Sequence, residues 1–331
     1  MDQLLEGLKA IAEPTRLRIV AVLESCELTV SELCTVLGQT QPRVSRHLRL
    51  LTEAGLLSRQ AEGTSAYYGL RRLPDGDGLV HAIAPLIDRS SPVYQRDQAR
   101  LEAVRADRAV RAAEYFAQVA EEWDELREMH APTNQVEEAM LAAVPADSVR
   151  TVLDIGTGTG RILELFADRA ETGLGIDLSR QMLAVARARL DDDRLSHCSV
   201  RHADIYDLDV EPDTQDLVIL HHVLHFLPDP VSAVETAART VAPGGTLLIV
   251  DFAVHDLERL RADHAHLHLG FAETEVAGWC RSFGLDDIAV QHFTVPPDPS
   301  HDALTVTLWT AAKQLAKKNT TVDPRPLEVS R

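Results

Sequence analysis

The sequence predicts two structural units of different fold class. The first is an α+β unit dominated by helices and ending in a β-hairpin, and the second is an α/β unit with a Rossmann-like, doubly wound sheet. A chain of 331 residues exceeds one ordinary domain. Residues 1–72 carry short helical patterns followed by two strand patterns, whereas apolar strands alternate with helices after residue 145. Such alternation is typical of crossover connections and a largely parallel sheet.

Charge is distributed unevenly along the chain. The net charge is −18, yet residues 1–72 hold nine Lys/Arg and eight Asp/Glu, so the rest of the chain carries −19. Only the first segment can therefore approach a phosphate backbone without strong repulsion. The four cysteines are scattered, and no apolar run approaches the ~20 residues that span a bilayer. These features predict a cytoplasmic protein without disulfides or a membrane partner.

Breaks in composition divide the chain into four parts. A Pro/Gly/Asp-rich break and a Ser-Ser-Pro step follow the hairpin, and residues 93–129 then lack both Pro and Gly. We expect a first domain at 1–92, a helical linker at 93–145, the α/β domain at 146–312 and a disordered tail at 313–331. The expected strands are Val152–Ile155, Thr172–Ile176, Ser199–His202, Leu217–Leu220, Thr246–Val250, Ile288–Gln291 and Thr305–Thr310.

Two consecutive helices in the first unit have clear boundaries. Thr29 and Glu32 form a capping-box pattern, and Gly38 is a natural stop for the helix that they begin. A second helix is expected from about Gln41 to Ala54, with Pro42 in its first turn. A tight turn therefore joins a capped helix to a second one, as in a helix-turn-helix.

The second helix has one apolar and one basic face. Val44, Leu48 and Leu51 stand at helical spacing and are expected to face the core. Arginine can bind guanine bidentately, glutamine can bind adenine, and serine can bind a base or a phosphate. The candidate DNA-contacting residues on the opposite face are Gln41, Arg43, Ser45, Arg46 and Arg49.

A hairpin wing is expected after Gly55. The strand patterns Leu56–Arg59 and Ser65–Leu70 flank Ala61–Thr64, and Arg59 and Thr64 are its candidate DNA contacts. A basic helix face alone is more often simply solvated. The ordered set of capped helix, turn, basic helix and hairpin favours DNA binding.

Residues 5–70 closely resemble the ArsR/SmtB family of bacterial repressors. The resemblance implies a homodimer that is paired through its first and last helices and reads a two-fold symmetric operator. Metal-sensing members carry two cysteines one residue apart, but here Thr35 and Val36 follow Cys34, so no metal site is expected. The matching segments are Ala12–Ile19, Ser31–Leu33, Gln41–Leu48, Glu53–Leu56 and Tyr67–Tyr68.

A glycine-rich turn follows the first strand of the second unit. Gly156, Gly158 and Gly160 allow the backbone to turn sharply and a ligand to approach it closely. Asp177 ends the next strand, where its carboxylate could accept hydrogen bonds from two ribose hydroxyls. A dinucleotide fold would use the same aspartate. The bulky Arg161 stands where the nicotinamide fingerprint requires glycine, so NAD is the weaker interpretation.

This unit instead looks like a class I S-adenosylmethionine-dependent methyltransferase over residues 145–311. The resemblance implies S-adenosylmethionine as cofactor, with S-adenosylhomocysteine as product or effector. It places Asp154 near the methionine end of the cofactor, Asp177 on the ribose, and Leu178 and Met182 beside the adenine. Further matching positions are Asp204 and Ile205 near the adenine amino group, Asp216–His222 with His221 near the sulfonium, and Pro243–Gly245 before strand five.

Candidate catalytic residues are fewer. His221 and His225 follow strand four, where a base for a methyl acceptor could stand, although histidines at strand ends are often only hydrogen-bonded. Aromatic residues such as Tyr115, Phe116 and Trp123 could form a lid, although aromatics on a helix are more often core. A second cluster, His264, His266 and His268, is interpreted as a solvated or substrate-facing loop rather than a metal site.

Two functions remain open at this point. One is a DNA-binding regulator that responds to S-adenosylmethionine or S-adenosylhomocysteine through the helices of residues 93–129. The other is a small-molecule methyltransferase with an autoregulatory DNA-binding module. A nucleic-acid methyltransferase is disfavoured, because the strand-four end reads His221-His222-Val223-Leu224 and the surface is acidic.

Overall fold

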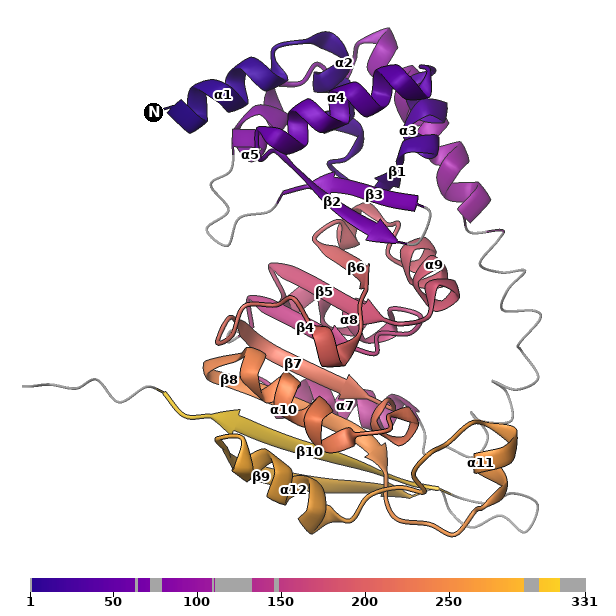
Figure 1. Cartoon of the computed structure of the whole chain (residues 1–331), viewed down its shortest axis with the longest axis vertical. Coiled ribbons are helices and arrows are strands. Elements are labelled where there is room, and N and C mark those ends of the chain that lie inside the picture. Colours follow the sequence, from indigo (N-terminus) through magenta and orange to yellow (C-terminus); the bar gives the residue numbers. More distant parts are fainter. Residues whose placement is uncertain are drawn as a thin grey trace, which may run out of the picture.

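The computed structural model contains two units, arranged one above the other in Figure 1. The helical unit and its hairpin lie at the top, and a twisted sheet flanked by helices lies below. The structure describes residues 2–62, 65–71, 79–108, 110, 133–145, 149–294 and 304–315. The expected lid residues Tyr115, Phe116 and Trp123, most of the expected tail and the hairpin residue Thr64 lie outside these ranges.

The N-terminal unit has the predicted order of helices, turn and hairpin. Thr29 caps α3 with both hydrogen bonds of a capping box, and Gly38 ends the helix in the left-handed conformation with φ 62°. The second hairpin strand, Ser65–Leu70, has its predicted bounds, whereas the first, Leu57–Glu62, extends three residues beyond its predicted end at Arg59. The elements are α1 (Asp2–Ile11), α2 (Pro14–Val22), β1 (Leu28–Thr29), α3 (Val30–Leu37), α4 (Gln41–Glu53), β2 (Leu57–Glu62), β3 (Ser65–Leu70) and α5 (Leu79–Ile83).

Apolar side chains from all these helices form one core. The predicted inward residues Val44, Leu48 and Leu51 are completely buried in it. A helix over residues 92–108 also packs here through Leu101 and Val104. Residues 93–108 of the expected linker are therefore packed onto the N-terminal unit.

The C-terminal unit contains one seven-stranded sheet with the order β6-β5-β4-β7-β8-β10-β9. The first five strands in this order are parallel, and β10 is antiparallel to both of its neighbours. This confirms the predicted doubly wound α/β fold. The strands are β4 (Thr151–Ile155), β5 (Thr172–Asp177), β6 (Cys198–His202), β7 (Gln215–His221), β8 (Val241–Phe252), β9 (Leu285–Thr294) and β10 (Thr305–Lys313).

Helices cover both faces of this sheet. Side chains of α7, α8 and α9 belong to one buried apolar cluster, and those of α10 and α12 belong to a second. The chain reverses its direction across the sheet at β4, which lies between β5 and β7, and ligands bind in such folds outside the strand ends at this point. The helices are α7 (Thr133–Ala143), α8 (Arg161–Phe166), α9 (Arg180–Arg189), α10 (Pro230–Thr240), α11 (Arg259–Asp263) and α12 (Glu273–Ser282).

Among the strands of the sheet, β8 differs most from its predicted start. β8 starts at Val241 instead of Thr246, and its pairing with β7 shifts register between Gln215 and Leu217. The expected turn Pro243–Gly245 therefore lies within the strand, where Gly244 has a φ of 87°. Within the described ranges, no helix combines the length and the apolar character needed to cross a membrane.

Candidate functional site

The glycine-rich turn between β4 and α8 forms the floor of the candidate site. Gly156, Gly158 and Gly160 all have positive φ values, of 76°, 52° and 77°. A Cβ at Gly156 would lie 2.5 Å from Val223, whereas one at Gly158 would meet only a single atom, 4.0 Å away. Gly156 is thus required for packing, and Gly158 leaves open space beside the strand ends.

Asp177 is held rigidly next to this turn. Its carboxylate accepts hydrogen bonds from the backbone N–H of Gly158 at 2.9 Å and of Ser179 at 2.7 Å. One side chain at the end of β5 therefore connects the glycine-rich turn to the start of α9. Each carboxylate oxygen retains a lone pair that a hydroxyl donor could use.

Asp154 lies at the same strand ends but is completely buried. Its two oxygens have no hydrogen-bond partner among the described residues. Burial raises the pKa of Asp154 to about 7, and the nearby negative charge of Asp177 acts in the same direction. A buried carboxyl group without a partner is costly, so a hydrogen-bond donor from outside the chain would stabilise it.

The burial of Asp154 predicts a pH-dependent stability. Because its pKa is raised in the folded protein, the folded state retains a proton that the unfolded state loses between about pH 4 and 7. Stability is therefore lost as pH rises through this interval, by up to about 4 kcal/mol.

We expect Asp154→Asn to remove this dependence, because the amide does not ionise. Urea unfolding of the ligand-free protein at pH 5 and pH 8, followed by tryptophan fluorescence, measures the effect. The loss of stability between the two pH values should be larger in the wild type than in the variant. Equal losses would show that Asp154 is already ionised at pH 5 without cost.

The residues expected around an adenine surround the start of α9. Leu178 is 56% exposed beside Asp177, although it is a large apolar side chain. Met182 is half-buried, and its backbone N–H donates to the capping hydroxyl of Ser179. On the neighbouring loop, Asp204 caps the short helix Ile205–Asp207 and Ile205 is buried. All these predicted residues follow β5 and β6 on the side of the glycine-rich turn.

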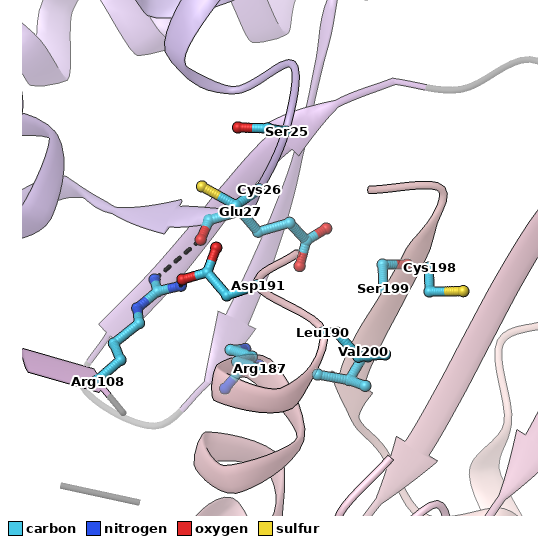
Figure 2. Close-up of a pocket in the computed structure, with 10 residues that line it drawn as sticks. All are labelled: Ser25, Cys26, Glu27, Arg108, Arg187, Leu190, Asp191, Cys198, Ser199 and Val200. Carbon is cyan, nitrogen blue, oxygen red and sulfur yellow. Dashed lines mark hydrogen bonds and ion pairs between the residues drawn. The ribbon is translucent and has the colours of Figure 1, made fainter. Parts of the chain in front are cut away.

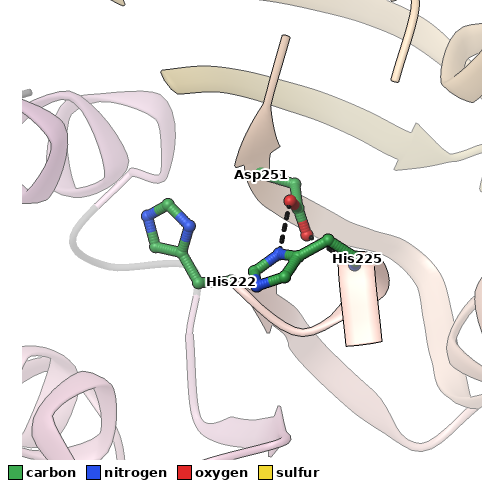
Figure 3. Close-up of side chains that lie close together, drawn as sticks. All are labelled: His222, His225 and Asp251. Carbon is green, nitrogen blue, oxygen red and sulfur yellow. Dashed lines mark hydrogen bonds and ion pairs between the residues drawn. The ribbon is translucent and has the colours of Figure 1, made fainter. Parts of the chain in front are cut away.

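A histidine and an aspartate form a buried pair at the ends of β7 and β8. His225 Nδ1 lies 2.7 Å from Asp251 Oδ1, as Figure 3 shows, and both residues are at most 2% exposed. The carboxylate also accepts from the backbone N–H groups of Leu224 and Phe252. These bonds orient Asp251, and Asp251 in turn fixes the proton of His225 on Nδ1. The Nε2 atom of His225 is left as an acceptor.

Other histidines surround this pair. His266 is 2% exposed, its ring centroid lies 4.2 Å from that of His225, and burial lowers its pKa to about 3. Burial also lowers the pKa of His221 to about 4. His222, His225 and Asp251 each have a potential metal-ligand atom within 4.8 Å of the others. Because the Asp251 oxygens already accept four hydrogen bonds, their arrangement favours an oriented base over a metal site.

The second histidine cluster of the sequence is distributed over different surroundings. His266 packs against His225, whereas the ring of His268 lies 3.0 Å from the backbone oxygen of Leu227. His264 follows the end of α11. The rings of His266 and His268 therefore have different partners, although the backbone N–H of His268 also donates to the backbone oxygen of His225 at 3.1 Å.

The candidate DNA-reading residues of α4 are all exposed. The side chains of α4 alternate between buried apolar residues and exposed polar ones, as its pattern predicts. On the hairpin, Arg59 is also exposed. Thr64 lies outside the described residues. The exposed members on α4 are Gln41, Arg43, Ser45, Arg46 and Arg49.

Sequence reasoning missed two important residues. Asp251 ends the apolar run of β8, and an acidic residue at the end of a parallel strand is a signal that could have identified it. Arg187, on α9, forms a buried ion pair with Glu62 of the hairpin. No sequence motif relates these two residues, which are 125 positions apart.

Comparisons with known proteins agree with the two units. Residues 13–59 match the family described as bacterial regulatory protein, arsR family, and residues 153–249 match the family described as methyltransferase domain. The arsenical resistance operon repressor of Escherichia coli K12 is 51% identical over 63 residues, which are 19% of this chain and 54% of that repressor. The chain thus spans about half the length of this relative.

The second unit has relatives among methyltransferases. A ubiquinone biosynthesis O-methyltransferase of Leptothrix cholodnii is 27% identical over 190 residues, covering 52% of this chain and 80% of that enzyme. The structure of a Haemonchus contortus phosphoethanolamine N-methyltransferase is 18% identical with a TM-score of 0.48, covering 54% of this chain and 52% of that one. Both resemblances that the sequence predicts are therefore confirmed: residues 13–59 match the arsR family of bacterial regulatory proteins, and residues 153–249 match a methyltransferase domain.

Proposed function

We propose that the protein is a DNA-binding transcriptional regulator whose methyltransferase domain binds S-adenosylmethionine and S-adenosylhomocysteine and adjusts DNA binding in response. The division into domains at 1–92, 93–145 and 146–312 is part of this proposal. The observation that carries it is the joint arrangement of an exposed basic helix in one unit and the Asp177-braced glycine turn in the other.

The residues of the glycine-rich site fit an adenosine-containing cofactor with an amino-acid end. Asp177 has spare acceptor capacity for ribose hydroxyls, and the exposed Leu178 offers an apolar surface to a purine. The buried, unpartnered carboxyl group of Asp154 would gain a charged partner from an ammonium group. Gly158 keeps the intervening space open. A nucleotide polyphosphate fits less well, because both carboxylates would repel it.

Two features of the N-terminal unit support operator binding by a dimer. The exposed arginines of α4 provide side chains for base and phosphate contacts. On α1, Leu4, Leu5 and Leu8 are 40–50% exposed, although they form an apolar stripe. An apolar stripe on a terminal helix fits pairing with a second copy of the chain.

Operator binding can be tested after in vitro selection of a duplex from random sequences. We expect Arg46→Ala to weaken binding by about 1–3 kcal/mol, measured by fluorescence anisotropy at fixed salt, because one base or phosphate contact is lost. Arg281→Ala, which removes an exposed charge from α12 in the other unit, is the matched control. Equal loss in both variants would indicate only general charge attraction.

The response to ligand is tested on the same duplex. Saturating S-adenosylhomocysteine should change the duplex affinity by a factor of roughly 5–150, which is the usual range of coupling between sites. Light scattering should show a dimer bound to each duplex. Unchanged affinity, when calorimetry shows that the ligand is bound, would contradict the sensor function.

A second function, methyl transfer to a small molecule, is favoured by the His225–Asp251 pair. S-adenosylmethionine, when bound, supplies an electrophilic methyl group, so the chain must mainly position the acceptor. His225 Nε2 would accept the proton that a hydroxyl acceptor loses, and Asp251 would stabilise the resulting positive charge. The similarity to an O-methyltransferase supports a hydroxyl-bearing acceptor.

A further inference from the structure

The β2–β3 hairpin of the DNA-reading unit lies against one edge of the methyltransferase domain. Figure 1 shows the two strands above α9 and the edge strand β6. Residues from the hairpin, from the turn before β1 and from the helix of residues 92–108 all pair with charged residues of this edge. The two domains are therefore joined through the DNA-reading wing itself, and not only through the connecting chain.

A buried charge pair forms the centre of this contact. Glu62, near the tip of the hairpin, accepts two hydrogen bonds from the Arg187 guanidinium, at 2.6 and 3.2 Å. Both side chains are 6% exposed. The guanidinium also stacks on Tyr67 of β3, 3.6 Å from the ring centroid. Because a buried charge without its partner is costly, this contact strongly favours the docked position of the hairpin.

Further ion pairs surround this centre. Arg201 of β6 lies 2.7 Å from Glu27, and Arg105 lies 2.8 Å from Asp191, which follows α9. Figure 2 shows the small cavity between the two domains, with Arg108 and Glu27 on one side and Arg187 and Asp191 on the other. Its volume of about 30 Å³ is sufficient for a water molecule but not for an organic ligand.

α9 connects this contact to the glycine-rich site. Its first turn follows Asp177, whose carboxylate also binds Gly158. Near its other end, a Cβ on Gly160 would lie only 3.2 Å from Ala186, the residue before Arg187. The glycine-rich turn thus packs directly on the helical turn that holds the hairpin. Because the two are closely packed, a movement of the glycine-rich turn would displace α9.

The face of the hairpin that is turned away from the methyltransferase domain remains exposed to solvent. Side chains along β2 alternate between the two faces, so that Arg59 and Ala61 are exposed whereas Glu62 is buried. Tyr67, which stacks on Arg187, is paired with Gln60 across the hairpin. One face of the wing is consequently held by the methyltransferase domain, and the opposite face presents Arg59 to solvent.

We propose that the Glu62–Arg187–Tyr67 contact couples the glycine-rich site to DNA binding: occupancy of the site shifts α9, and α9 repositions the wing and its Arg59. This inference rests on the proposed function and specifies its route. It replaces the expected route through the helices of residues 93–129 with a direct contact between the domains.

The test compares Glu62→Arg, Arg187→Glu and the double variant in the full chain. Hydrogen exchange of residues 57–70 is measured with and without S-adenosylhomocysteine, and anisotropy gives the ligand-induced change in duplex affinity. In each single variant we expect the change in exchange to disappear and the affinity ratio to fall to within twofold of one. The double variant, which restores an ion pair of reversed polarity, should recover both. Arg281→Glu is the charge-matched control.

Each outcome has a distinct meaning. If the single variants retain the wild-type ratio, or if the double variant recovers neither readout, the contact is not the route. If the wild type binds ligand and duplex without any coupling, both this inference and the sensor function fail. If calorimetry shows no ligand binding, the cofactor assignment itself fails. Glu62→Gln, which keeps the shape of the side chain, replaces Glu62→Arg if the latter does not fold.

Discussion

Asp177→Asn is expected to weaken the binding of S-adenosylhomocysteine by about two orders of magnitude. The carboxylate would accept two ribose hydroxyls while it holds the N–H groups of Gly158 and Ser179. Charge-assisted hydrogen bonds contribute about 1.5–3 kcal/mol each, so the loss of two is a large effect. The asparagine amide would also point a donor at one backbone donor. Isothermal titration calorimetry measures the change directly.

The matched control for this variant is Asp209→Asn. Asp209 is an exposed aspartate of the same domain, on the loop before β7, so its replacement changes net charge equally. We expect its ligand affinity to stay within twofold of the wild type. If Asp177→Asn also binds normally, Asp177 only braces the turn, and the cofactor must be held elsewhere.

His225→Ala is expected to have the largest effect on methyl transfer. General base catalysis contributes about 10²–10⁴-fold, and the Nε2 atom of His225 is the acceptor that Asp251 orients. The rate of S-adenosylhomocysteine release, measured with 3,4-dihydroxybenzoate and other small hydroxyl acceptors, should fall by this factor. Affinity for S-adenosylhomocysteine should remain unchanged, because the loss is in turnover.

His292→Ala is the control for this histidine. His292 is 47% exposed on β9 and is paired with Glu273. Dialysis against a chelator should leave the rate unaltered, because the Asp251 oxygens already accept hydrogen bonds. A rate that the chelator abolishes would instead assign His222, His225 and Asp251 to a metal ion. A rate that is unchanged in His225→Ala would remove the general base from the proposal.

Local patterns predicted most helices and strands and the position of the glycine-rich turn. The capping box at Thr29, the stop at Gly38 and the apolar spacing of Val44 and Leu48 are each encoded within a few residues, so the helix-turn-helix could be recognised directly. The same holds for the glycine-rich turn and for Asp177 at the end of β5. Because the carboxyl ends of parallel strands meet at one edge of a sheet, the strand pattern alone predicts that these residues lie together.

The partners of His225 and of Glu62 could be identified only from the tertiary structure. Asp251 meets His225 because β8 lies beside β7 in the sheet, and Glu62 meets Arg187 because the hairpin docks on α9. These pairs are separated by 26 and 125 residues, whereas hydrophobic periodicity and capping report only on neighbours within a few positions. The sequence by itself determined which two domains form and which strand ends carry the site. Packing between distant segments determined which histidine is oriented and how the domains contact each other.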